Sequence, residues 1–204
     1  MVEAAPVVGP AAHVRIESWS GRQLSARVAE AMQIYVVAMN YPSYTGAQRS
    51  ASARTHTTNQ GFACRAALLD DGKLVGFGYG YTTRPGQWWH DLVRRAVSRD
   101  VAAQWLSDAF ELSEMHVLPD YQGLGIGRRL LSSLAEGIAH RAMLLSTPDA
   151  DTRAFRLYRS MGFRDLARNY LFPGDSRPFA VLGAWLPLAS EPQPAARGGK
   201  RTSG

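Results

Sequence analysis

The stretch that most constrains the fold is the glycine-rich loop QGLGIG at residues 122–127, which stands directly before an amphipathic helix. Glycine adopts backbone conformations that other residues avoid, so three alternating glycines let successive amide groups point the same way. The helix that follows begins with unpaired N–H groups and the positive end of its dipole. Together, the loop and the helix start predict an anion-binding site.

The residues after the loop favour a phosphate ligand. Arg128 and Arg129 add positive charge in a first helical turn, where acidic residues are usually preferred. A dinucleotide fingerprint would need a glycine in place of Arg128, and a Walker-type loop would need Gly-Lys followed by Ser or Thr. Neither pattern is present. The structural alternative is a turn that merely lets the helix pack close to a strand.

Length and composition bound the class of protein. The chain has 204 residues, of which 46% are hydrophobic, enough for one domain with a substantial core. The apolar run at 34–39 is too short to span a bilayer, and residues 1–10 lack the pattern of a signal peptide. Cys64 stands alone, so a disulfide framework is not expected. We therefore predict a cytoplasmic protein without a membrane partner.

Charge and segment composition predict the domain organisation. The formal net charge of +6 favours an anionic partner, either nucleic acid or a phosphorylated ligand. We predict a flexible N-terminus at 1–11, a single domain at 12–188 and a disordered basic tail at 189–204. A mixed aromatic and basic segment at 84–106 reads as an insertion in that domain.

Hydrophobic periodicity predicts alternating strands and helices. Ile126, Leu130, Leu134 and Ile138 recur every four residues, which indicates one helix, and Ser20 or Gly21 is the expected cap of an early helix. Asp70-Asp71-Gly72 is the turn of a hairpin. Helices are predicted at 23–40, before 61, at 127–141 and at 149–163, and strands at 13–19, 62–69, 74–83, 109–119, 142–147, 164–172 and 177–188. This order predicts an α/β or α+β fold with helices on both faces of a mixed sheet.

Two motifs resemble those of one enzyme family. Residues 122–127 match the Gln/Arg-x-x-Gly-x-Gly/Ala signature of the GNAT acyltransferase superfamily. The segment DTRAFRLYRSMGF at 151–163 is similar to the family's NxxAxxLYxxxGF helix, with Asp151 where asparagine is common. The resemblance covers 60–187 and implies a mostly antiparallel central sheet in the order β-α-α-β-β-β-α-β-α-β-β. It also implies an acetyl-CoA-dependent N-acetyltransferase that needs no metal.

The resemblance also implies where acetyl-CoA binds. Its pyrophosphate would lie on backbone amides of the glycine loop and on Arg128, and its pantetheine arm would pair with a strand like an additional strand. Asp151 would contact the cofactor or cap its helix, and Tyr158 would lie beside the sulfur. The implied cofactor residues are Met115, His116, Val117, Gln122, Gly123, Leu124, Gly125, Ile126, Gly127, Arg128, Asp151 and Tyr158.

Acyl transfer to an amine needs an acid and a base. In the family the residue matching Tyr158 acts as general acid or hydrogen-bond donor; the alternative is a core tyrosine. Glu111 is the first choice for the base and Glu114 the second, directly or through one water. Strand alternation places Glu111 on one face and Glu114 with His116 on the other, unless a bulge intervenes. Glu111 could equally attract an ammonium group.

The acceptor is the least constrained part of the prediction. The aromatic residues either stack on a flat or cationic substrate or form core; they are Tyr41, Tyr44, Trp88, Trp89, Trp105, Tyr170 and Phe172. We favour a small-molecule amine, with a protein or peptide amine as the alternative and a non-catalytic acyl-CoA sensor as the rival class. Nucleic acid is disfavoured because no binding module is recognised. A homodimer is left open.

Overall fold

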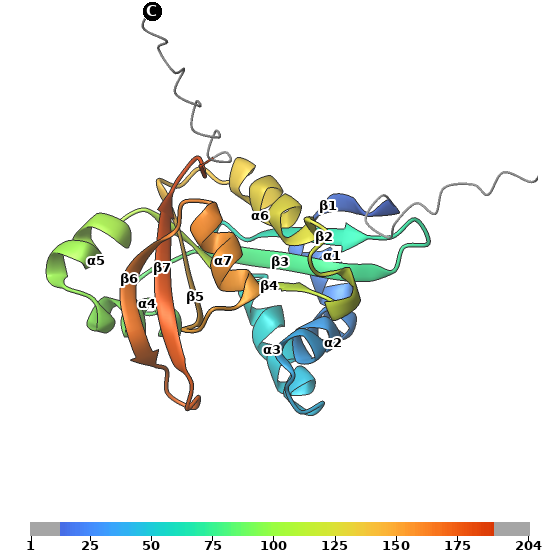
Figure 1. The fold of residues 1–204 in the computed structure, drawn as a ribbon, viewed down its shortest axis with the longest axis horizontal. Helices are drawn as coiled ribbons and strands as arrows, with labels where there is room; N and C mark the ends of the chain where they lie inside the picture. The colour runs from blue at the N-terminus through green and yellow to red at the C-terminus, as the bar shows by residue number, and fades with distance from the viewer. Residues whose placement is uncertain (1–12, 190–204) are drawn as a thin grey trace, which may run out of the picture.

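The computed structural model describes residues 13–189 (Figure 1). The predicted segment 1–11 and all but the first residue of the predicted tail lie outside this range. The elements in chain order are β1 (Arg15–Trp19), α1 (Gly21–Ala26), α2 (Val28–Met39), α3 (Thr45–His56), β2 (Ala63–Leu68), β3 (Leu74–Thr82), α4 (Trp88–Ala96), α5 (Arg99–Trp105), β4 (Ala109–Val117), the 3-10 helix η2 (Pro119–Tyr121), α6 (Ile126–Glu136), β5 (Ala142–Pro148), α7 (Arg153–Ser160), β6 (Arg164–Leu171) and β7 (Pro178–Trp185).

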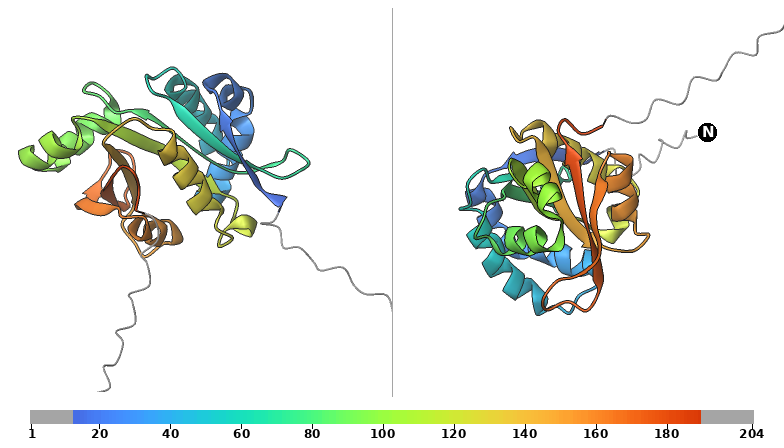
Figure 2. Two further views of the ribbon diagram at one scale, coloured as in Figure 1. Left: turned by 90° about the horizontal axis from the view of Figure 1, so that it is seen from above. Right: turned by 90° about the vertical axis from the view of Figure 1, so that its left-hand side faces the viewer.

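The seven strands form one sheet in the order β1-β2-β3-β4-β5-β7-β6. Every neighbouring pair is antiparallel except β4 and β5, which confirms the mixed, mostly antiparallel sheet. The parallel pairing joins only 109–111 of β4 to 142–144 of β5. Beyond it the β5–β7–β6 part turns away from β1–β4 (Figure 2, left). This divergence frees the rest of β4 to border a cleft.

Helices cover both faces of the sheet, as predicted (Figure 1). On one face α1, α2 and α3 pack on β2 and β3, where Met32 lies in one buried cluster with Cys64 and Phe77. On the other face Leu130 of α6 packs against Val75. Alternating side chains of β2 and β3 reach the two clusters, because successive residues of a strand point to opposite faces.

The helical segments are divided more finely than the sequence predicted. The segment 23–40 forms two helices, α1 and α2, that meet at Arg27. Ser20 is the N-cap of α1 and forms a capping box with Gln23. The segment 84–106, which the sequence predicts to be an insertion, contains α4 and α5. These two helices between β3 and β4 are added to the predicted order.

Two other helix boundaries correct the predictions. Helix α6 ends at Glu136, so Ile138 lies beyond it, although Ile138 still packs against the cluster of its last turn. Helix α7 is capped by Thr152, whose hydroxyl accepts the Phe155 N–H at 3.0 Å. Asp151 is therefore not the helix cap. Thr152 occupies the N-cap position, because its backbone has the extended conformation that an N-cap needs.

Candidate active site

A cavity of about 1180 Å³ opens where β4 and β5 diverge. It is bordered by α2, α3, β3, β4, the glycine loop, β5, α7 and the connection between β6 and β7. It brings together most of the predicted site residues, namely Glu111, Glu114, Met115, His116, Val117, Gln122, Gly123, Gly125, Gly127, Arg128 and Tyr158. One cleft therefore joins the predicted acid, base and anion loop.

Three predicted cofactor residues do not line this cavity. The Ile126 side chain is buried in the core under α6, and the Leu124 side chain is partly exposed. For Leu124 and Ile126 the predicted cofactor contact is made by the backbone N–H. The position of the side chain therefore does not test it. Asp151 is exposed and pairs with Arg156 at 2.7 Å. A cofactor contact of Asp151 stays a prediction.

A β-bulge places both glutamates of β4 at the cavity. The register of β3 with β4 passes from Tyr79 opposite Glu114 to Gly80 opposite Leu112, so Ser113 is an extra residue. Without the bulge, alternation would place Glu111 and Glu114 on opposite faces. A Cβ at Gly80 would lie 1.9 Å from the Glu111 carbonyl oxygen, so the chains approach this closely only at a glycine.

Glu111 is a buried carboxyl group in which one oxygen makes no hydrogen bond to the described residues. Its side chain is 3% exposed, and the Tyr81 hydroxyl donates a hydrogen bond to Oε1 at 3.1 Å. Oε2 has no hydrogen-bond partner among residues 13–189. Burial raises the pKa of Glu111 to about 8, because the charged form loses its hydration. The group can therefore gain or lose a proton near neutral pH.

Glu114 is buried as an ion. Its carboxylate accepts hydrogen bonds from Nε of Arg49 at 2.7 Å and from Nε2 of His116 at 2.6 Å. Burial alone would raise the pKa of Glu114, but Arg49 and His116 outweigh burial and lower it to about 2. With both oxygens engaged, Glu114 is better placed to hold Arg49 and His116 than to take a proton.

We predict that Arg49→Met lowers the free energy of unfolding by about 2 to 3 kcal/mol at pH 7, since it leaves Glu114 buried with less compensation. The contribution of Glu114 is present above pH 4.5 and is lost as the pH falls toward 2. The difference between variant and wild type should therefore shrink in acid. Urea unfolding at several pH values measures it, with the exposed Arg22→Met as control. A loss as small as that of the control would contradict the buried-ion interpretation.

Tyr158 points from α7 into the same cavity. Its side chain is 6% exposed, and burial, together with the nearby Glu114, raises the pKa of its hydroxyl above the usual value. The hydroxyl therefore keeps its proton at neutral pH and acts as a donor. Its roles as acid and cofactor contact remain predictions.

The glycine loop has the backbone of an anion site. Gly123 and Gly125 have φ values of 80° and 77°, and Gly125 is the N-cap of α6. The side-chain amide of Gln122 donates to the Val117 carbonyl at 2.9 Å, which ties the loop to the end of β4. Arg128 donates to Ser160 of α7 at 2.8 Å. These residues fit a pyrophosphate, and the unpaired edge of β4 fits an extended arm.

Some residues at the site were not predicted from the sequence. Arg49, His56 and Tyr81 line the cavity, but they come from α3 and β3, far from β4 along the chain. Arg49 lies on a polar helix that gave no signal for it. Tyr81 shares strand alternation with Tyr79, which is the only pattern that could have drawn attention to it.

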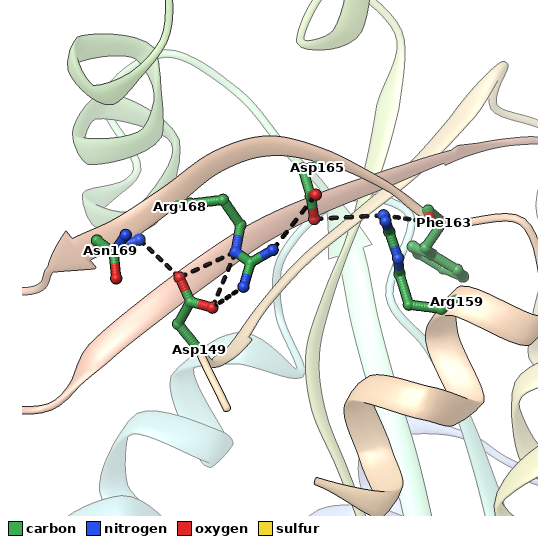
Figure 3. Close-up of polar contacts among 6 residues, drawn as sticks. All are labelled: Asp149, Arg159, Phe163, Asp165, Arg168 and Asn169. Carbon is green, nitrogen blue, oxygen red and sulfur yellow. Dashed lines mark hydrogen bonds and ion pairs between the residues drawn. The ribbon is translucent and has the colours of Figure 1, made fainter. Parts of the chain in front are cut away.

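A polar network links the end of β5, α7 and β6 (Figure 3). Asp149, directly after β5, accepts the backbone N–H of Asn169 at 2.7 Å and pairs with Arg168. Arg168 of β6 and Arg159 of α7 each donate a hydrogen bond to the Asp165 carboxylate. Asn169 has a positive φ of 54°, next to an irregularity in the pairing of β6. The network holds β5, α7 and β6 together beside the cavity.

Comparison with known proteins identifies the family. Residues 28–163 match the acetyltransferase (GNAT) family, so the chain belongs to it. A "GCN5-like protein acetyltransferase" of Mycobacterium tuberculosis is 36% identical, over 81% of this chain and 94% of that protein. The ribosomal protein bS18-alanine N-acetyltransferase of Escherichia coli is 34% identical over 42% of this chain and 61% of that protein.

Solved structures share the fold. An Escherichia coli ribosomal-protein-S18-alanine N-acetyltransferase has a TM-score of 0.56 at 20% identity, covering 87% of this chain and 97% of that one. A Salmonella typhimurium protein described as an acetyltransferase, with its cofactor acetyl-CoA, has a TM-score of 0.59 at 18% identity, covering 88% and 98%.

Family membership establishes the class of enzyme. The chain is an acyltransferase of the GNAT family that uses acetyl-CoA. Among residues 13–189, no helix has both the length and the apolar composition needed to cross a bilayer.

Proposed function

We propose that this enzyme transfers the acetyl group of acetyl-CoA directly to a primary amine, with Glu111 as general base and Tyr158 as general acid. The observation that carries the proposal is that one cavity contains a buried carboxyl group with a free oxygen and a buried phenol. Burial raises the pKa of Glu111 to about 8, which suits a base near neutral pH. Burial also raises the pKa of Tyr158, which keeps its hydroxyl protonated as a donor.

The remaining residues bind and orient. Bound acetyl-CoA supplies a thioester, whose carbonyl carbon is open to attack by an amine. Backbone amides of the glycine loop, with Arg128, hold the pyrophosphate, and the edge of β4 at 115–117 holds the pantetheine arm. Glu111 takes one proton from the incoming ammonium, and the neutral amine forms the C–N bond at the thioester carbonyl carbon. Tyr158 gives its proton to the sulfur as the C–S bond breaks, and the second proton of the nitrogen returns to the Tyr158 oxygen.

Direct transfer agrees with the position of the single cysteine. Cys64 is fully buried in β2 beneath α2, and burial raises the pKa of its thiol to about 12. It does not line the cavity. An acyl-enzyme on Cys64 is therefore not part of the proposal.

A small-molecule amine and a protein amine are each favoured as acceptor by a different observation. The Tyr41 hydroxyl donates to Asp175 at 3.3 Å, and this contact links α2–α3 to the β6–β7 connection at the cavity. Such a link limits access and favours a small amine. The similarity to a protein acetyltransferase favours a protein amine. A cytoplasmic location remains a prediction, and the oligomeric state stays open.

Release of free thiol from acetyl-CoA in the presence of amines, with mass spectrometry of the products, tests the proposal. Small amines and lysine or N-terminal peptides should be compared in the same assay. Amine-dependent thiol release together with a mass increase of one acetyl group is expected. Acetyl-CoA binding without transfer to any of these amines would instead favour the sensor class.

We predict that acetyl-CoA at a hundred times its Kd stabilises the protein by about 2.7 kcal/mol, a rise in Tm of roughly 5 to 11 °C. Arg128→Ala should weaken binding about tenfold, because it removes a charged donor from the loop. Arg129→Ala is the matched control, since Arg129 bonds to the Val14 carbonyl and does not line the cavity. Equal effects of the two substitutions would contradict a phosphate contact of Arg128.

A further inference from the structure

One end of the cavity is walled by aromatic rings. The aromatic wall consists of Trp88 and Trp89 from α4 and Phe172 and Phe179 from the β6–β7 hairpin and its connection. The ring centroids of Trp88 and Phe172 are 5.8 Å apart, and those of Phe172 and Phe179 are 5.4 Å apart. These residues line the same cavity as Glu111. The insertion therefore supplies part of the wall.

The two tryptophans of α4 have different environments. Trp89 is 7% exposed, belongs to the core beneath α4, and donates its indole N–H to Ser146 of β5 at 3.1 Å. Trp105 of α5 stacks on Trp185 at 3.9 Å. Both side chains anchor the segment 84–106 in the core. Trp105 does not line the cavity, whereas Trp89 also borders it. Trp88 is 60% exposed although it lines a hollow, so its indole face is available to a ligand.

Two of the three acidic residues that line the cavity are paired with arginines. Asp175 pairs with Arg177 at 2.7 Å, and Glu114 pairs with Arg49 at 2.7 Å. Glu111 has no cationic partner among residues 13–189. In its ionised form the Glu111 carboxylate attracts an ammonium group.

We propose that the aromatic wall binds an aromatic ring carried close to the accepting amine, and that Trp88 makes the insertion a specificity element of this enzyme. The inference rests on the proposed function, whose acceptor it narrows. Offset stacking on the exposed indole would hold the ring while the amine reaches Glu111. The ring could belong to a small arylalkylamine or to an aromatic residue next to the amine of a peptide.

The test compares paired acceptors that differ only in the ring. 3-Phenylpropylamine is compared with propylamine, and a lysine peptide with phenylalanine beside the lysine with the same peptide carrying alanine there. Wild-type kcat/KM should be higher for the ring-bearing member of at least one pair, and the pair that discriminates identifies the source. Trp88→Ala should lower that preference by roughly tenfold or more, mainly through KM, whereas Trp88→Phe should retain most of it.

Leu171→Ala is the matched control. Leu171 is also 60% exposed and precedes Phe172, but it does not line the cavity. Equal losses for ring-bearing and ring-free acceptors in Trp88→Ala, or an unchanged preference, would overturn the aromatic wall while leaving the proposed function intact. A wild-type preference for neither ring would overturn it as well. A wild-type protein that acetylates none of the four acceptors would contradict the proposed function, and the wall with it.

Discussion

Glu111→Gln is expected to lower kcat/KM for a primary amine by about 10²- to 10⁴-fold at pH 8, because it removes the group that we propose takes the amine proton. For the wild-type enzyme kcat/KM should rise with pH until Glu111 is ionised, at about pH 8. It should then stay level until the amine itself loses its proton, near pH 10 for a lysine-like amine. Steady-state rates between pH 6 and 10 measure this profile.

The variant should have a different profile. Glutamine takes up no proton, so the variant must bind the small neutral fraction of the amine, and its kcat/KM should keep rising to the amine pKa. The deficit relative to wild type should therefore narrow in alkali. If kcat/KM of the variant still rises to a plateau near pH 8, as in the wild type, another group is the base. Glu114 and a solvent-mediated path would then be tested next.

Stability separates this effect from unfolding. The folded-state pKa of Glu111 lies above its unfolded value, so wild-type stability should decrease as the pH rises from about 4.5 to about 8. Glutamine does not ionise, so the variant should be at least about 1 kcal/mol more stable than wild type at pH 8.5. Low activity in a protein of higher stability would be a chemical effect.

Tyr158→Phe is expected to lower kcat by about 10²- to 10³-fold with little change in acetyl-CoA affinity, because it removes a proton donor and preserves the ring. The hydroxyl is buried, and its raised pKa keeps the proton in place across the assay range. Single-turnover rates and thermal shifts with acetyl-CoA measure the two effects separately.

The ring itself is part of the core. It lies in the same buried cluster as Met161 and Phe163, with its centroid 5.5 Å from that of Phe163. Tyr158→Ala should therefore also destabilise the fold, by about 3 to 5 kcal/mol, which makes phenylalanine the informative substitution. A wild-type kcat in Tyr158→Phe would contradict the general-acid role and leave Tyr158 with a structural role alone.

Local sequence patterns were enough to predict the elements that form within a few residues. Alternation and helical periodicity gave the hairpin of β2 and β3, the helix after the glycine loop and the strand at 142–147. The positive φ values at Gly72, Gly123 and Gly125 were implied by glycine at turns and caps. Because each of these features depends on interactions within a few residues, it can be predicted from the neighbouring residues in the sequence.

The meeting of the proposed catalytic groups depends on packing between segments that are distant along the chain. The bulge at Ser113 depends on the pairing of β4 with β3, and it moves Glu111 and Glu114 to one cavity. The ionisation of Glu114 depends on Arg49, which lies 65 positions away, and that of Glu111 depends on burial. Cross-strand register, desolvation and long-range charge pairs are set by packing, so no local pattern in the sequence contains them.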